Sequence, residues 1–225
     1  MTTQSDQITT LLLCRHGESQ WNLEGRIQGQ SPDAPGLTAL GREQARLLAE
    51  RMRSAGVDVL VTSDLRRAAE TAGFVSRALG LEPVQDSSWR EIGLGEWQGL
   101  TRSQVAERWP GMLEAVGRGE DPPRGGGETY AQLTTRTLAA AADLARRYAG
   151  QTICVVTHGG NVRSAMLALP GAPDGLEIKS IPVFNTSVTV LQVTGDGARL
   201  MAPPDISHLD GMATTLNEKI DDEPR

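Results

Sequence analysis

The sequence contains few cysteine, histidine and aromatic residues. Its 225 residues include 2 Cys, 3 His, 4 Trp, 2 Tyr and 2 Phe. Two cysteines are too few for a disulfide scaffold, and the scattered histidines lack the paired spacing of a zinc site. Because 39% of the residues are hydrophobic but only 4% are aromatic, we expect one domain-sized core built mainly from aliphatic side chains.

Long hydrophobic runs and an excess of positive charge are also missing. The first apolar run, residues 11–13, is far too short for a signal peptide or a membrane span. There are 22 Lys and Arg residues against 28 Asp and Glu, a net charge of −6. Such a balance argues against a general nucleic-acid or anionic-membrane binder. We therefore expect a soluble, cytoplasmic protein with neither nucleic acid nor membrane as a partner, and a homodimer stays open.

Three absent motifs remove whole reaction classes. The sequence has no Gly-x-x-x-x-Gly-Lys-Ser/Thr phosphate loop and no Gly-x-Ser-x-Gly nucleophile elbow. The Cys-x5-Arg pattern of cysteine phosphatases fails at both cysteines, because position 20 is Gln and position 160 is Gly. These absences exclude P-loop nucleotide hydrolases, the usual serine hydrolases and cysteine phosphatases.

Apolar periodicity predicts strands that alternate with helices. The expected strands are 9–14, 57–62, 81–85 and 152–157, with a closing hairpin of 186–193 and 198–201. The expected helices are 38–54 (N-cap Thr38), 65–79 (N-cap Ser63 or Asp64), one opening at Thr101, 130–148 and 161–169, and residues 17–36 form a long loop. This alternation is typical of an α/β sandwich with a mainly parallel sheet.

Two of the three histidines directly follow predicted core strands. His16 comes after the strand 9–14, and His158 comes after the strand 152–157. The carboxyl ends of parallel strands form the edge where α/β sheets bind ligands. A glycine after each histidine lets the backbone approach a ligand closely. With Arg15 and the pair Arg66-Arg67 at the same edge, the sequence predicts a site for a phosphoryl group.

These residues belong to ordered blocks, spread over residues 8–193, that resemble the histidine phosphatase superfamily. The blocks are Arg15-His16-Gly17-Glu18-Ser19 with Trp21-Asn22; Leu37-Thr38 with Gly41; Ser63-Asp64-Leu65-Arg66-Arg67-Ala68 with Thr71; Glu91 with Gly95-Glu96-Trp97-Gln98-Gly99; and Gly126-Gly127-Glu128, followed by Val156-Thr157-His158-Gly159-Gly160. The resemblance implies a three-layer α/β/α sandwich of the phosphoglycerate mutase-like type.

The resemblance also assigns roles. His16 would be the nucleophile that becomes a phosphohistidine, and Glu91, rather than Glu96, would be the general acid and base. The phosphoryl oxygens would be held by Arg15, Asn22, Arg67, Gly159 and a protonated His158. The spacing from Ser63 selects Arg67 over Arg66, which would face outward. The implied chemistry needs neither a metal ion nor a cofactor.

Within this family, the residues after the acid favour a phosphatase over a mutase. Cofactor-dependent mutases follow the acid with Arg-His-Tyr-Gly and carry a longer insertion, whereas here Glu91 precedes Ile92-Gly93-Leu94-Gly95. The implied activity is hydrolysis of a small phosphomonoester. A mutase-type phosphotransferase is the alternative. A non-catalytic phospho-ligand binding module is disfavoured because the nucleophile, the acid and the arginines are all present.

Substrate specificity is expected to come from the least patterned parts of the chain. Gln28 lies in one such segment, and residues 100–127 form a specificity insertion within a single domain of residues 1–216. Ser207-His208-Leu209 is similar to a terminal His-Leu of histidine-type phosphoserine phosphatases, so His208 is a second candidate. A surface histidine on a loose tail is the alternative for His208. Residues 217–225 are charged and predicted to be disordered.

Overall fold

The computed structural model describes residues 7–171, 182–210 and 212, and in these residues the chain forms one six-stranded sheet. The strand order is β3-β2-β4-β1-β5-β6. Strands β3, β2, β4 and β1 pair in parallel, β5 runs antiparallel to β1, and β6 runs antiparallel to β5. The strands are β1 (Thr9–Arg15), β2 (Val59–Thr62), β3 (Val84–Gln85), β4 (Thr152–Thr157), β5 (Val188–Thr194) and β6 (Gly197–Asp205). The mainly parallel sheet and the closing hairpin are confirmed.

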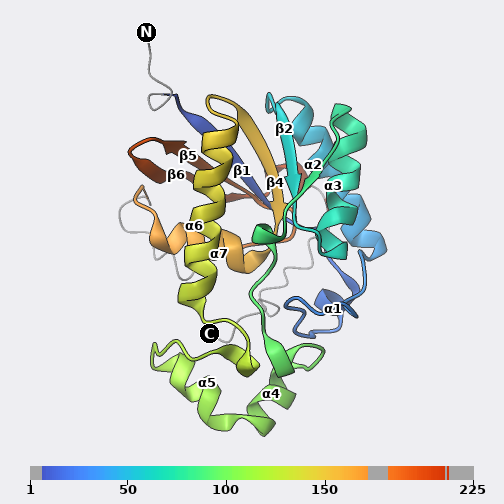
Figure 1. Ribbon diagram of the computed structural model, residues 1–225. Helices are drawn as coiled ribbons and strands as arrows, with labels where there is room; N and C mark the ends of the chain where they lie inside the picture. The colour runs from blue at the N-terminus through green and yellow to red at the C-terminus, as the bar shows by residue number, and fades with distance from the viewer. Residues whose placement is uncertain (1–6, 172–181, 211, 213–225) are drawn as a thin grey trace.

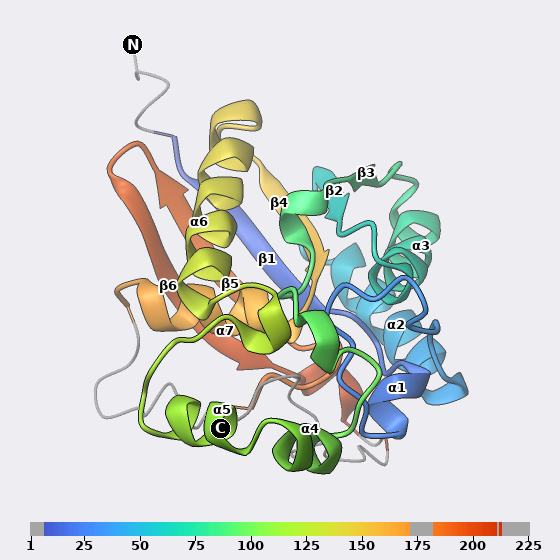
Figure 2. The ribbon, with the colours of Figure 1, turned by 60° about the horizontal axis from the view of Figure 1, so that its bottom comes forward.

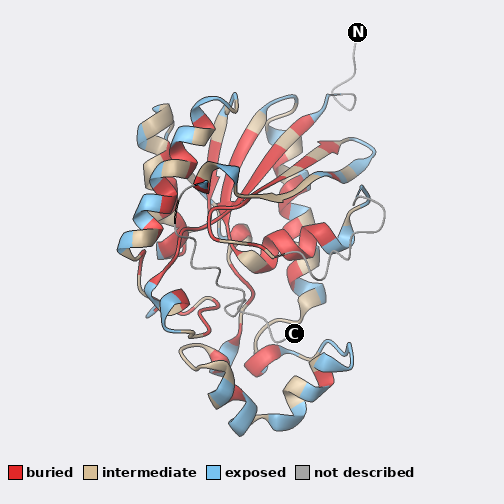
Figure 3. Ribbon diagram, turned by 180° about the vertical axis from the view of Figure 1, so that it is seen from behind, coloured by how far each residue is buried: buried red, intermediate tan, exposed pale blue. Residues whose placement is uncertain are grey.

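Helices cover both faces of the sheet (Figure 1). On one face lie α2 (Ala39–Arg53) and α3 (Arg66–Leu79), and on the other lie α6 (Tyr130–Arg147) and α7 (Gly159–Ala168). Leu11 and Leu13 of β1 pack toward α6 and α7, whereas Leu12 and Cys14 pack toward α2 and α3. This alternation is the period of two along a strand. Burial on both faces explains why the central strands β1 and β4 are almost continuously apolar (Figure 3).

Most helix boundaries follow the expected capping chemistry. The Thr38 side chain accepts a hydrogen bond from the Gly41 N–H, and Thr101 forms a capping box with Gln104. Gly80 ends α3 in the left-handed conformation. The expected cap of α3 is wrong: the N-cap is Leu65, without a side-chain bond. The Ser63 hydroxyl instead accepts a hydrogen bond from the Leu65 N–H and contacts His158. Ser63 therefore contributes to the sheet edge where the histidines lie rather than to the helix cap.

Two other expectations need correction. The loop 17–36 contains α1 (Gln20–Leu23), which is capped by Ser19 and lacks the apolar periodicity of a longer helix. The last helix begins at Gly159, two residues earlier than expected, because His158 is its N-cap. Its first turn therefore starts directly beside the strand end.

Residues 100–127 form α4 (Arg102–Arg108), α5 (Pro110–Gly117) and the short 3-10 turn η4 (Arg124–Gly126). They pack on a separate small core around Ile92, Leu94 and Trp97. Figure 2 shows α4 and α5 at the same end of the molecule as α1. η4 approaches 3-10 turn η3 (Gly95–Trp97) so closely that a Cβ at Gly125 would lie 2.4 Å from the Leu94 carbonyl oxygen. A single domain of residues 1–216 stays a prediction, and the tail 217–225 lies outside the described residues.

Candidate active site

The sheet register places the two histidines side by side. In the parallel pairing of β1 and β4, Arg15 is opposite Thr157, so His16 and His158 leave the sheet at equivalent positions. The His16 N–H donates to the Thr157 carbonyl (2.9 Å), and the two imidazole centroids are 5.2 Å apart. After β1 the chain proceeds to α2 on one face, and after β4 to α7 on the other. Such a divergence is where open α/β sheets bind ligands.

His16 is fully buried and held in one tautomer. Its Nδ1 lies 2.7 Å from the Gly17 carbonyl oxygen, and its Nε2 lies 3.1 Å from Nε of Arg67. Because the guanidinium can only donate, Nε2 must carry a lone pair and Nδ1 must carry the proton. Burial lowers the pKa of His16 well below its usual range, and the charges of Arg67 and Arg15 lower it further. The imidazole is therefore neutral, with a lone pair on Nε2.

Two buried guanidinium groups flank this imidazole. Arg67, in the first turn of α3, also donates to the Gly29 carbonyl (2.9 Å) and is 1% exposed. Arg15 donates to the Val183 carbonyl (2.6 Å), and its side chain passes beside Gly159. Arg66 is exposed and pairs with Glu70. The choice of Arg67 over Arg66 as the inward-facing arginine agrees with this geometry.

The buried carboxamide of Asn22 is oriented by the cap of α1. The backbone N–H and the hydroxyl of Ser19 both lie within hydrogen-bond distance of Asn22 Oδ1, at 3.1 and 3.0 Å. This fixes the oxygen and leaves the Nδ2 donors without a partner in the described part of the chain. Gln28 is also buried, and its Oε1 lies 2.8 Å from the same hydroxyl. Gln28 thus borders the Asn22 carboxamide, and its role in specificity stays a prediction.

His158 is buried and lies 2.8 Å, through Nε2, from the Ser63 hydroxyl. Its Nδ1 has no hydrogen-bond partner among the described residues. Burial lowers the pKa of His158 well below its usual range, and the charges of Arg67, His16 and Arg15 act in the same direction. Burial and the nearby arginines thus favour the neutral imidazole while no anion is bound. The protonated His158 that is expected beside a phosphoryl group stays a prediction.

Glu91 lies on the loop after the 3-10 turn η2 (Ser87–Trp89) and is 1% exposed. Its Oε1 accepts from the Ile92 N–H (2.8 Å), and its Oε2 accepts from the Gly160 N–H (3.2 Å) in the first turn of α7. A carboxylate is favoured by the positive end of a helix. Glu96, in the same loop, is exposed, so the structure brings Glu91 rather than Glu96 to the histidines.

Taken together, the sheet edge holds a neutral imidazole, two guanidinium groups, a buried amide donor and a buried carboxylate. Residues 11–205 match the histidine phosphatase superfamily (branch 1). The chain belongs to this superfamily. It is therefore an enzyme that acts on phosphate groups, and the expected phosphoglycerate mutase-like fold is confirmed.

Some of the similar proteins in the histidine phosphatase superfamily are named as mutases and others as phosphatases. The chain is 35% identical over 206 residues to the probable phosphoglycerate mutase GpmB of Enterobacter sp. (strain 638), covering 89% of this chain and 95% of that protein. It is 34% identical to YhfR of Bacillus stearothermophilus, with a TM-score of 0.79 and coverage of 90% and 100%. A mycobacterial glucosyl-3-phosphoglycerate phosphatase is 30% identical, with a TM-score of 0.76 and coverage of 89% and 100%.

A segment that the sequence analysis missed holds the backbone of this histidine phosphatase site. Asn185 donates through Nδ2 to the His16 carbonyl (2.9 Å), and the Thr186 N–H donates to the Arg15 carbonyl (3.1 Å). Thr186 has a φ of 58°, a costly conformation for a β-branched residue. No local pattern indicated this role, since the segment directly precedes β5, a strand that lies between β1 and β6.

His208 lies behind the same segment. It contacts the Thr186 hydroxyl through Nε2 (3.2 Å) and Arg51 of α2 through Nδ1 (3.2 Å). The burial of its ring and the charge of Arg51 lower the pKa of His208 to about 4. His208 is half-buried in the 3-10 turn η6 (Ser207–Leu209), which packs against α2. Contact between His208 and a substrate stays a prediction.

Gly160 leaves no room for a side chain beside the carboxylate. A Cβ there would lie 2.1 Å from Glu91 Oε1 and 3.1 Å from Leu133 Cδ2. Gly160→Ala is therefore expected to displace the carboxylate and lower kcat/KM by about 100-fold, the usual scale for a mispositioned acid or base. Steady-state kinetics on a phosphomonoester would measure this. The matched control is Gly111→Ala on α5, where nothing lies within 4 Å; equal activity of both variants would contradict the expectation.

The neutral histidines predict that the free energy of unfolding decreases as the pH is lowered. Because the pKa values of His16 and His158 are lowered in the native state, the unfolded chain binds protons first as pH drops below about 6.5. Each histidine should then remove up to about 1.4 kcal/mol of unfolding free energy per pH unit. Urea titrations at pH 7.5 and 5.5 would measure the loss, and His158→Asn should reduce it. An unchanged unfolding free energy would contradict two neutral buried histidines.

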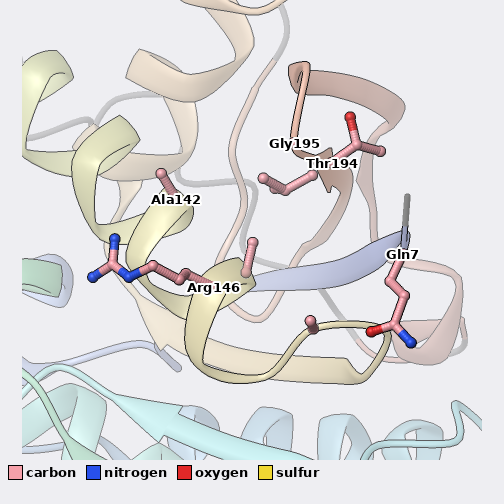
Figure 4. Close-up of a pocket in the computed structure, with 8 residues that line it drawn as sticks. Gln7, Ala142, Arg146, Thr194 and Gly195 are labelled. Atoms are coloured by element: carbon pink, nitrogen blue, oxygen red, sulfur yellow. The ribbon is translucent and has the colours of Figure 1, made fainter. Parts of the chain in front are cut away.

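A groove away from the two histidines lacks the combination of nucleophilic, cationic and acidic side chains found at the sheet edge. It encloses about 390 Å³ between α6 and the end of β5, and Gln7, Ala142, Arg146, Thr194 and Gly195 line it (Figure 4). Among the described residues that line it, Arg146 is the only ionisable side chain, and it pairs with Asp143. Within the described residues, no helix has the length and apolarity to cross a membrane.

Proposed function

We propose that this enzyme is a phosphomonoesterase that works through a phosphohistidine on His16. The observation that carries the proposal is the neutral imidazole, whose Nε2 lone pair faces Arg67 at 3.1 Å while a buried carboxylate stands at the start of α7. A neutral imidazole is nucleophilic without losing a proton. Inorganic or ester phosphate would satisfy the buried donors that surround it.

In the first half-reaction, an oxygen of the substrate phosphoryl group replaces His16 Nε2 as the acceptor of the Arg67 Nε–H hydrogen bond. The freed Nε2 lone pair then attacks phosphorus. The Nε2–P bond forms as the P–O bond to the leaving group breaks. Glu91, a carboxylate while the site is empty, takes up a proton from solvent as the phosphate anion binds beside it. It then gives this proton to the leaving alkoxide, which departs as an alcohol. Arg15, Arg67, the Asn22 Nδ2 group and the N–H of Gly159 stabilise the charge on the equatorial oxygens.

In the second half-reaction, water cleaves the phosphohistidine. The Glu91 carboxylate accepts a proton as the water oxygen attacks phosphorus, and the Nε2–P bond breaks to regenerate neutral His16 and release phosphate. His158 accepts a proton when the dianion is bound, because a nearby negative charge favours the imidazolium form. No step requires a metal ion.

Hydrolysis is favoured over transfer to a second substrate by the residues that follow Glu91. Positions 92–95 are Ile, Gly, Leu and Gly, which offer no cationic clamp for a phosphoglycerate acceptor. A relative named as a phosphatase supports this assignment. The name of GpmB keeps a phosphoglycerate mutase as the second candidate.

The deciding experiment measures phosphate release from a panel of phosphomonoesters with EDTA present, beside interconversion of 2- and 3-phosphoglycerate. We expect metal-independent release, and the ranking by kcat/KM identifies the preferred substrate class. Interconversion faster than release would support the mutase. Loss of release on chelation that metal restores would contradict the metal-free mechanism.

A further inference from the structure

An ion pair outside the histidine cluster is hydrogen-bonded to the backbone of residues 88–93, the loop that carries Glu91. Arg136 of α6 forms a two-pronged contact with Glu128, with Nε to Oε1 at 3.1 Å and a terminal nitrogen to Oε2 at 2.8 Å. Their side chains are only 23% and 26% exposed. A planar guanidinium fork against a carboxylate is the geometry that fixes both partners most firmly.

The remaining donors of Arg136 reach backbone carbonyls of the acid loop. Its terminal nitrogens donate to the carbonyl oxygens of Ser88 (2.9 Å), Arg90 (2.8 Å) and Glu91 (3.3 Å). Ser88 lies in the 3-10 turn η2, and Arg90 and Glu91 lie between η2 and η3, outside the described strands of the sheet. One side chain thus fixes the path of the backbone up to and including the acid.

Glu128 fixes the far side of the same loop. Its Oε2 accepts from the Gly93 N–H (2.7 Å), and Gln30, which donates to the Glu91 carbonyl (2.8 Å), lies 3.4 Å from the same oxygen. The close approach of Gly127 to this loop, where a Cβ would lie 2.0 Å from the Gly93 carbonyl oxygen, brings Glu128 into place. Thr129 then caps α6, which puts Arg136 two turns further along the helix.

We infer that Glu128 and Arg136 are positioning residues that aim the Glu91 carboxylate at the leaving-group oxygen. Neither side chain touches the reacting atoms. They act by holding residues 88–93, so that the carboxylate meets the Ile92 and Gly160 N–H groups. The inference rests on the proposed function, because it takes Glu91 to be the general acid.

Leaving-group dependence separates this role from a merely structural one. An alkoxide needs a proton from the acid in order to leave, whereas 2,4-dinitrophenolate leaves without one. The constant kcat/KM suits the comparison because it reports only the steps up to phosphorylation of the enzyme. We expect Glu128→Gln and Arg136→Gln to lower kcat/KM about 100-fold for an alkyl phosphate but less than about 3-fold for 2,4-dinitrophenyl phosphate. Arg136→Lys, which keeps the charge but not the fork, should resemble Arg136→Gln.

The control is Leu144→Ala, two turns further along α6, where a buried leucine packs in the main core. Its instability should lower both kcat/KM values equally. Equal loss for both substrates in the Glu128 and Arg136 variants, or no loss, would overturn the inference. Glu128→Gln, which is isosteric, carries the test alone if Arg136→Gln does not fold.

Glu91→Gln is measured in parallel to separate the two proposals. If Glu91→Gln shows the leaving-group dependence and the Glu128 and Arg136 variants do not, only the positioning role fails. If Glu91→Gln shows no dependence, Glu91 is not the general acid, and the acid step of the proposed function fails together with the positioning role.

Discussion

His16→Ala is expected to lower phosphate release by about 10⁶-fold, the scale seen when a nucleophile is removed. The reason is geometric: the Nε2 lone pair of His16 is presented by the Gly17 and Arg67 contacts, and alanine leaves nothing to form the N–P bond. The measurement is release from an activated aryl phosphate at pH 7, with folding checked by circular dichroism.

A second measurement tests the covalent intermediate directly. Quenching with alkaline detergent after mixing with labelled substrate should leave a phosphoryl group that is stable to alkali and labile to acid on the wild type, and none on His16→Ala. Arg66→Ala, at the exposed neighbour of Arg67, serves as the unaffected control. If the His16→Ala protein became labelled, or if it kept its activity, another group would have to accept the phosphoryl group.

Glu91→Gln is expected to lower kcat/KM for alkyl phosphates by about 10³-fold, within the range of general acid–base catalysis. Glutamine keeps the size of the side chain but cannot deliver a proton to the leaving alkoxide. It also cannot take one from the attacking water, so the phosphohistidine should accumulate. Rapid-mixing experiments with an aryl phosphate should then show a burst of phenol followed by slow turnover.

The matched control for this substitution is Glu96→Gln. Glu96 occupies the same loop but is exposed, so its replacement should leave both the burst and the steady state unchanged. If Glu96→Gln reproduced the defect and Glu91→Gln did not, the acid would be misassigned.

Local sequence patterns predicted the scaffold because short-range chemistry governs it. The apolar runs of β1 and β4 form strands buried on both faces, as their continuous hydrophobicity indicated. Thr38 and Gly80 mark helix ends by hydrogen bonding and by the left-handed conformation. The placement of His16 and His158 followed from one rule about the carboxyl edge of parallel sheets.

Contacts distant in sequence could not be predicted in this way. Asn185 lies 169 residues after the His16 carbonyl that it binds, and no periodicity links the two positions. The grip of Arg136 on Ser88, Arg90 and Glu91 likewise joins two segments that meet only after the sheet has formed. Arg136 was not singled out by the sequence, because an arginine on a helix usually faces solvent.

Periodicity, capping residues and ordered motifs were enough to predict the α/β scaffold, the family resemblance and the edge at which the histidines lie, since all of these are readable along the chain. The charge state of the site depends instead on three-dimensional packing. Complete burial of His16 and His158 beside two guanidinium groups lowers both pKa values, and burial depends on every element that packs around the rings. The orientation of Glu91 was decided in the same way, by a helix, a glycine and an ion pair from separate parts of the chain.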